Sequence, residues 1–144
     1  MDEAKSAALK LVLTKRRTEK EVVEKLKAKG FSTEDAISAA SYYREAGYID
    51  HHEYALRFSH DAAYIKGFGP LRIRRDLLSR GIEEIFISDA LATISFDVKD
   101  AMQMKYGSGQ KSEKELFQIY QYYARKGFAP ECIRDALRAL FTYE

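Results

Sequence analysis

A motif that occurs three times constrains the fold of this chain more than any other feature. It consists of an apolar residue, two variable residues, a cation, a glycine and a large apolar residue, at 26–31, 77–82 and 123–128. Glycine just past a helix end readily enters the left-handed region, and the next apolar residue then packs back on the helix it left. The motif therefore predicts three similar units built from helices with short connections.

Helix starts are marked as clearly as helix ends. Thr18 with Glu21 and Ser112 with Glu115 have the spacing of a capping box, and Pro70 and Pro130 suit a first helical position. Dipeptides typical of hairpins, Asn or Asp before Gly, do not occur in the sequence, so we expect no hairpin. Together the starts and ends predict about nine helices, near 3–14, 18–29, 33–46, 50–66, 70–80, 83–94, 97–106, 112–126 and 130–142.

These helices group into one all-α domain over 1–144. Its expected architecture is an elongated array of three tandem three-helix repeats, at 1–49, 50–95 and 96–144, because each unit buries too little alone and must stack on its neighbours. Hydrophobic residues make up 46% and charged residues 32%, which is typical of globular proteins. No apolar run approaches the roughly 20 residues that span a bilayer. The single cysteine, Cys132, excludes an internal disulfide and is expected to be buried on an apolar helix stripe, in a reducing cytoplasm.

The sequence offers no catalytic constellation and no metal site. His51, His52 and His60 lack the spacing of ligands to one ion and are interpreted as exposed helix positions. Cys132 has no histidine near it in sequence, and the glycines before Pro70 lack the Gly-Lys-Ser/Thr ending of a phosphate loop. We therefore expect a binding protein without enzymatic activity or cofactor.

Positive charge is concentrated in the middle of the chain. The formal net charge is only +2. Between residues 66 and 80, however, five cations accompany the single acid Asp76: Lys66, Arg72, Arg74, Arg75 and Arg80. The planar fork of arginine favours carboxylate and phosphate recognition, so we predict that these five residues bind a partner. The alternative is a solvated helix face whose side-chain stems cover the core. Neighbouring tyrosines such as 122–123 are interpreted as core and rim residues rather than as base-stacking platforms.

Residues 67–82, from Gly-Phe-Gly-Pro through Arg-Arg-Asp-Leu-Leu to Arg-Gly-Ile, resemble the central signature of the RecX family. The run 47–50 (Gly-Tyr-Ile-Asp) and the segment 17–31 are similar to its other elements, although His51 stands where the family often has a second acid. The residues that carry this resemblance as a structural signature are Gly30, Phe31, Gly47, Tyr48, Asp50, Gly69, Pro70, Gly81, Ile82, Gly127 and Phe128.

The resemblance implies a cytoplasmic, monomeric bacterial regulator that acts in DNA repair, DNA recombination and the SOS response. Such a protein binds the RecA filament on single-stranded DNA, lodges in its helical groove, and limits strand exchange, ATP hydrolysis and co-protease activity. The alternative is a helical module that binds DNA directly. Helix 70–80 has arginines but no Asn or Gln to read base edges, so we expect any direct DNA binding to be weak.

Overall fold

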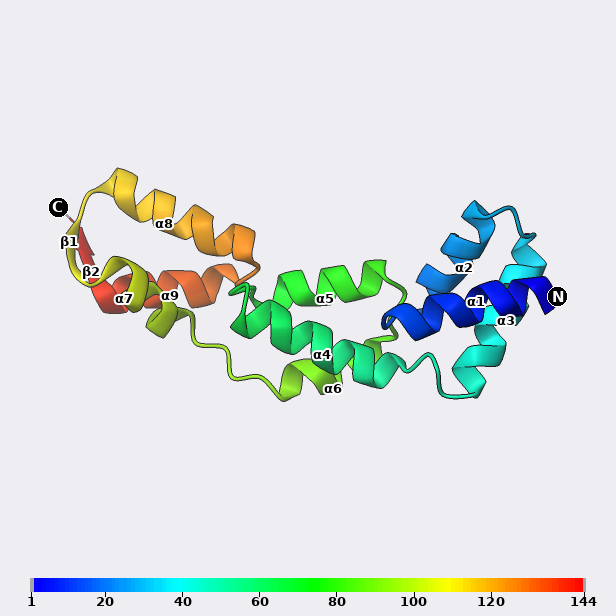
Figure 1. The fold of residues 1–144 in the computed structure, drawn as a ribbon. Coiled ribbons are helices and arrows are strands. Elements are labelled where there is room, and N and C mark those ends of the chain that lie inside the picture. Colours follow the sequence, from blue (N-terminus) through cyan, green and yellow to red (C-terminus); the bar gives the residue numbers. More distant parts are fainter. Residues whose placement is uncertain (1, 144) are drawn as a thin grey trace. The chain divides into compact units, whose positions relative to one another are not determined.

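The computed structural model describes residues 2–143 and separates them into two compact units. Unit 1 runs up to Phe58 and includes Leu77–Ala90; unit 2 contains Ser59–Asp76 and the chain from Leu91 onward. The described residues form nine helices and two short strands, which confirms the predicted all-α helical array (Figure 1). Among these helices, none is long and apolar enough to cross a membrane. The elements are α1 Asp2–Thr14, α2 Glu19–Ala28, α3 Thr33–Glu45, α4 His51–Tyr64, α5 Pro70–Ser79, α6 Glu84–Ala92, α7 Val98–Tyr106, β1 Gly109–Lys111, α8 Glu113–Lys126, α9 Pro130–Leu140 and β2 Phe141–Tyr143.

Local signals account for most helix boundaries. The side chain of Thr18 accepts a hydrogen bond from the Glu21 amide, and the Glu21 carboxylate accepts one from the Thr18 amide, so the predicted capping box forms. Ser112 and Glu115 form the second box at the start of α8. The glycines of the three motif copies, Gly30, Gly81 and Gly127, all have positive φ angles. The predicted ends agree with the observed ones to within about two residues.

The core of unit 1 lies among α1, α2 and α3, which contact one another. Ala36, Ala39 and Ala40 of α3 are fully buried, as are Val22 and Leu26 of α2. The helix that follows the first copy of the repeated motif, α3, is thus lined mainly with alanine on its buried side.

Unit 2 has a second core among α7, α8 and α9, where Met102 and Ile133 are fully buried. The chain leaves α9 at Leu140, earlier than the predicted end at 142, and β2 pairs in parallel with β1. The aromatic and β-branched residues of 141–143 favour an extended strand, and residues 109–111 supply the backbone partner. Local helical periodicity does not reveal this pairing.

The prediction that Cys132 is buried is wrong, because its side chain is exposed. The buried stripe of α9 consists of Ile133, Ala136 and Leu140. Cys132 precedes that stripe by one residue, a rotation of roughly 100° around the helix, and this carries it to the solvent side.

The prediction that His51 is exposed is also wrong, because only 3% of its surface is exposed. His52 and His60 are exposed as expected. Nε2 of His51 accepts a hydrogen bond from the Glu19 amide at 3.0 Å. Its Nδ1 lies 2.6 Å from Oε1 of Glu83. Because Nε2 accepts, the ring proton belongs on Nδ1, where it is donated to the carboxylate. Burial of this histidine is therefore compatible with full hydrogen bonding of its ring.

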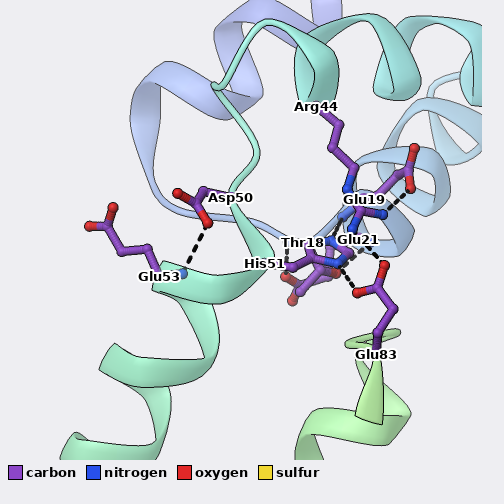
Figure 2. A network of polar contacts seen from close by, with 8 residues as sticks. All are labelled: Thr18, Glu19, Glu21, Arg44, Asp50, His51, Glu53 and Glu83. Atoms are coloured by element: carbon purple, nitrogen blue, oxygen red, sulfur yellow. Dashed lines mark hydrogen bonds and ion pairs between the residues drawn. The ribbon is translucent and has the colours of Figure 1, made fainter. Parts of the chain in front are cut away.

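Arg44 closes these contacts into a ring within unit 1 (Figure 2). It donates to Oε2 of Glu83 at 2.5 Å and to Oε1 of Glu19 at 3.0 Å. Four segments are joined in this way: the start of α2, the last turn of α3, the start of α4 and the connection before α6. Burial acts to raise the pKa of Glu83, but hydrogen bonds from His51 and Arg44 outweigh it and lower that pKa to about 2. The folded state therefore favours the charged carboxylate.

Replacing Glu83 with Gln tests the ring through its pH dependence. The folded pKa of about 2 lies below the reference value of 4.5, so the stabilisation is present above pH 4.5 and is lost as the pH falls toward 2. We expect Glu83→Gln to lower the urea midpoint at neutral pH and to flatten its decline between about pH 5 and pH 3. Glu131→Gln, at an exposed position of α9, is the control. An unchanged acid-side decline in Glu83→Gln would contradict the role of the ring.

Candidate functional site

The start of α5 is fixed in unit 2 by backbone pairing with the end of α8. The Gly69 amide donates to the Lys126 carbonyl at 2.7 Å, and the Leu71 amide donates to the Gly127 carbonyl at 3.0 Å. The last carbonyls of a helix and the first amides of another lack partners inside their own helices. Here the two ends satisfy each other, and Lys126 Nζ adds a hydrogen bond to the Lys66 carbonyl at 3.1 Å.

Two signature glycines make this approach possible. A Cβ on Gly69 would lie 2.6 Å from the Gly127 carbonyl oxygen, which is too close for any side chain. Gly127 has φ +102°, and a Cβ there would lie 2.6 Å from the backbone nitrogen of Arg72. Position 127 therefore requires glycine for two reasons. Its backbone is left-handed, and the backbone of Arg72 packs against it.

Arg72 is partly occupied by contacts within unit 2. Its guanidinium lies 3.7 Å from the ring centroid of Phe68, and its Nη1 donates to the Arg125 carbonyl at 3.2 Å. Its Nε is buried without a hydrogen-bond partner, and Oδ2 of Asp76 lies 3.9 Å away. One third of the side chain, 33%, remains exposed.

The other predicted cations of unit 2 differ in exposure. The side chain of Arg75 is 71% exposed and lies 3.7 Å from Asp76. Lys66 is exposed, whereas Arg74 is partly buried. Arg75 and Lys66 are therefore the predicted residues most accessible to a partner.

Arg80 belongs to unit 1, and its contacts are with residues of that unit. Its Nη1 donates to the Tyr54 hydroxyl at 2.9 Å and lies 3.5 Å from Oε2 of Glu21. The guanidinium also lies 4.7 Å from the ring centroid of Phe58. Burial, followed by the negative charge of Glu21, raises the pKa of Tyr54. These contacts assign Arg80 a structural place beside α2 and α4.

A basic groove of about 530 Å³ opens where α5 meets α8. Its arginines come from both helices: Arg72 and Arg75 from α5, and the exposed Arg125 from α8. Sequence reasoning missed Arg125 because it lies far along the chain from α5 and was regarded only as part of the repeated helix stop. The groove is lined by Leu71, Arg72, Arg75, Ala124, Arg125 and Gly127.

The groove has the chemistry of an anion-binding site. Guanidinium groups on both walls can form charge-assisted hydrogen bonds with carboxylate or phosphate oxygens. Within the described residues, no cluster of three or more His, Cys, Asp or Glu side chains is placed to hold a metal ion.

Comparison with known proteins gives consistent matches. RecX's first three-helix domain matches residues 4–40, and its second matches residues 50–91. The regulatory protein RecX of Caldanaerobacter subterraneus is 33% identical over 94% of this chain and 69% of its own length. That of Thermotoga petrophila is 31% identical over 92% of this chain and 81% of its own. A crystal structure of RecX from Lactobacillus salivarius has a TM-score of 0.76 at 21% identity, covering 96% of this chain and 95% of that one, which establishes similarity of fold.

Alanine substitutions at Gly127 and Gly30 separate close packing from backbone conformation. Both glycines have φ +102°, but a Cβ on Gly30 meets nothing within 4 Å. We expect Gly30→Ala to cost about 1–2 kcal/mol from the left-handed backbone alone. Gly127→Ala should cost about 1–3 kcal/mol more because Arg72 must move. Urea unfolding measures both, and equal losses would show that the α5–α8 junction yields without cost.

Proposed function

Because the chain belongs to the RecX family of regulatory proteins, we propose that it binds RecA nucleoprotein filaments and inhibits their recombinase, ATPase and co-protease activities. It would act without catalytic activity of its own, as a cytoplasmic monomer in DNA repair, recombination and the SOS response. We further propose that three repeats, at 1–49, 50–95 and 96–144, are its functional subdivisions.

The exposure of Arg75 is the observation that most supports this proposal. Arg75 projects from α5, inside the segment that matches the second three-helix domain of RecX, and 71% of its side chain is exposed. Lys66 adds a second exposed cation just before the same helix. A nucleoprotein filament presents DNA phosphates and acidic side chains, and arginine binds both with paired hydrogen bonds.

The proposal assigns unequal roles to the five predicted cations. Arg75 and Lys66 would contact the filament, with Arg74 beside them on α5. Arg72 would hold the groove in shape because its guanidinium already contacts Phe68 and the Arg125 carbonyl. Arg80 would stabilise unit 1 through Tyr54.

Charge reversal at the two exposed positions tests the filament contact. The wild-type chain should co-sediment with RecA on single-stranded DNA and slow ATP hydrolysis. For Lys66→Glu combined with Arg75→Glu, we expect half-maximal inhibition to need at least about tenfold more protein, since a loss of about 1.4 kcal/mol is tenfold in affinity. Helical circular dichroism should not change.

Arg134→Glu combined with Arg138→Glu is the matched control. Both arginines are exposed on α9, and neither lines the groove. The charge change is identical, so the control should inhibit RecA like the wild-type chain. Full inhibition of RecA by the chain that carries Lys66→Glu and Arg75→Glu would contradict the assigned contact. Wild-type protein that binds naked DNA tightly but leaves RecA unaffected would instead favour the alternative, a direct DNA-binding module.

A further inference from the structure

A small polar pocket of about 130 Å³ opens in unit 1, beside the first turn of α4. Three signature residues that the proposed filament contact does not use lie in its lining: Gly47, Tyr48 and Asp50. The connection between α1 and α2 contributes two adjacent arginines, and α4 adds an acid and a second tyrosine. The full lining consists of Arg16, Arg17, Gly47, Tyr48, Asp50, Glu53 and Tyr54. The signature over 47–50 therefore borders a surface pocket as well as a helix start.

The two arginines of the pocket keep their hydrogen-bonding capacity for a ligand. Within residues 2–143, the exposed side chain of Arg16 forms no hydrogen bond or ion pair. Arg17 is half-buried, and its Nε donates to the Leu11 carbonyl at 3.1 Å. A guanidinium has five N–H donors, so this bond leaves both terminal nitrogens of Arg17 able to donate. The pocket thus combines a mobile guanidinium with one that is anchored at its Nε.

The acids of the pocket are engaged within α4. Asp50 Oδ1 accepts from the Glu53 amide at 3.0 Å, at a helix start where the dipole favours negative charge. Oε1 of Glu53 pairs with Nε of Arg57 at 2.9 Å. Once Glu53 is paired with Arg57, two arginines remain against one aspartate. The pocket therefore retains an excess of one positive charge.

Tyr48 adds a neutral hydrogen-bond donor to this charge. Its ring packs edge-on against Tyr43 with centroids 5.6 Å apart, while 52% of the residue remains exposed. Within the described part of the chain, its hydroxyl has no hydrogen-bond partner. Tyr54 differs, because it is buried and its hydroxyl accepts from Arg80 at 2.9 Å. Tyr48 is thus the tyrosine that can donate to a ligand.

We propose that this pocket binds the carboxylate side chain of a glutamate or aspartate on a protein partner. One carboxylate matches the single excess positive charge, and arginine holds a carboxylate through two parallel hydrogen bonds. A phosphorylated side chain carries about −1.5 to −2 charges, and a nucleic-acid backbone brings one charge with every nucleotide. Either would place surplus negative charge against Asp50, where like charges repel.

The size of the pocket favours a side chain attached to a protein over a free ligand. Sites for small molecules enclose roughly 300–1,000 Å³, whereas this pocket admits one small polar group. A carboxylate bound here orients a larger contact and selects between partners. The site goes beyond the filament contact assigned to α5, because it recognises a protein side chain and uses residues of unit 1.

The test is an NMR titration of the isotope-labelled full chain with N-acetylglutamate N-methylamide, a blocked glutamate, at constant ionic strength. We expect saturable shifts of the amide signals of Gly47, Tyr48 and Glu53, with a dissociation constant on the order of 10 mM or below, as suits a ligand of this size. The blocked glutamine has the same shape without the charge and should cause no saturable shift.

Two single substitutions test the assigned groups. Arg16→Gln removes an exposed guanidinium and should weaken binding at least about fivefold, since a charge-assisted hydrogen bond is lost. Tyr48→Phe keeps the ring against Tyr43 and should weaken binding about two- to tenfold, as expected for a neutral hydrogen bond. Arg134→Gln, at an exposed position of α9, is the matched control and should bind within about twofold of the wild-type chain. The amide spectrum itself verifies that each protein is folded.

Several results would overturn the carboxylate site. The first is the absence of saturable shifts, or shifts confined to the basic groove, and the second is an equal loss in Arg16→Gln and Arg134→Gln. Tighter binding of inorganic phosphate at the same amides would assign the pocket to phosphate instead. Free glutamate that binds more than about tenfold tighter than the blocked form would assign it to a free amino acid. The titration contains neither RecA nor DNA, so failure of this site leaves the filament proposal to its own test with Lys66→Glu and Arg75→Glu.

Discussion

The pairing of two helix ends determines the geometry of the basic groove. Carbonyls at the end of α8 accept hydrogen bonds from amides at the start of α5, so polar groups that each helix leaves without partners are satisfied together. This pairing requires backbone-to-backbone contact, which only glycine permits at 69 and 127. Once it forms, the first turn of α5 is fixed beside Arg125, and arginines distant in sequence border one groove. The signature glycines thus shape the groove through their backbones, although they carry no side chain that could bind a partner.

Side-chain hydrogen bonds join four segments of unit 1, whereas backbone hydrogen bonds join the start of α5 to the end of α8. The imidazole of His51 accepts from one amide and contacts one carboxylate, so a buried polar residue leaves neither ring nitrogen without a partner. A carboxylate at position 51 could not donate a hydrogen bond to Glu83 as the His51 ring does. It would also face the Glu83 carboxylate across a short distance, where like charges repel. Histidine at 51 is therefore matched to Glu83 and Arg44 in this chain.

The accuracy of the sequence-based predictions follows the range of the interactions involved. The starts of α2 and α8 were predictable because Thr18 and Ser112 form hydrogen bonds with residues three positions away. His51 was misjudged because the Glu83 carboxylate that makes its burial tolerable lies 32 positions away. Arg125 was missed because its place beside α5 depends on the contact between Gly127 and Arg72. The charge excess over 66–80 indicated the wall of the groove that α5 forms. The second wall, which includes Arg125 of α8, became visible only in the folded structure.

Exposure and order divide the cations into two groups with different consequences for binding. Arg72 and Lys126 are held against aromatic rings and carbonyl oxygens, so folding has already restricted their side chains. Ordering a long charged side chain opposes binding by about 0.5–1.5 kcal/mol, and these two residues largely avoid that loss. Arg75 and Arg125 remain exposed and must be ordered by the partner. Affinity for a polyanion then depends on a preorganised base of positive charge, while the exposed arginines adjust to the positions of individual phosphates or carboxylates.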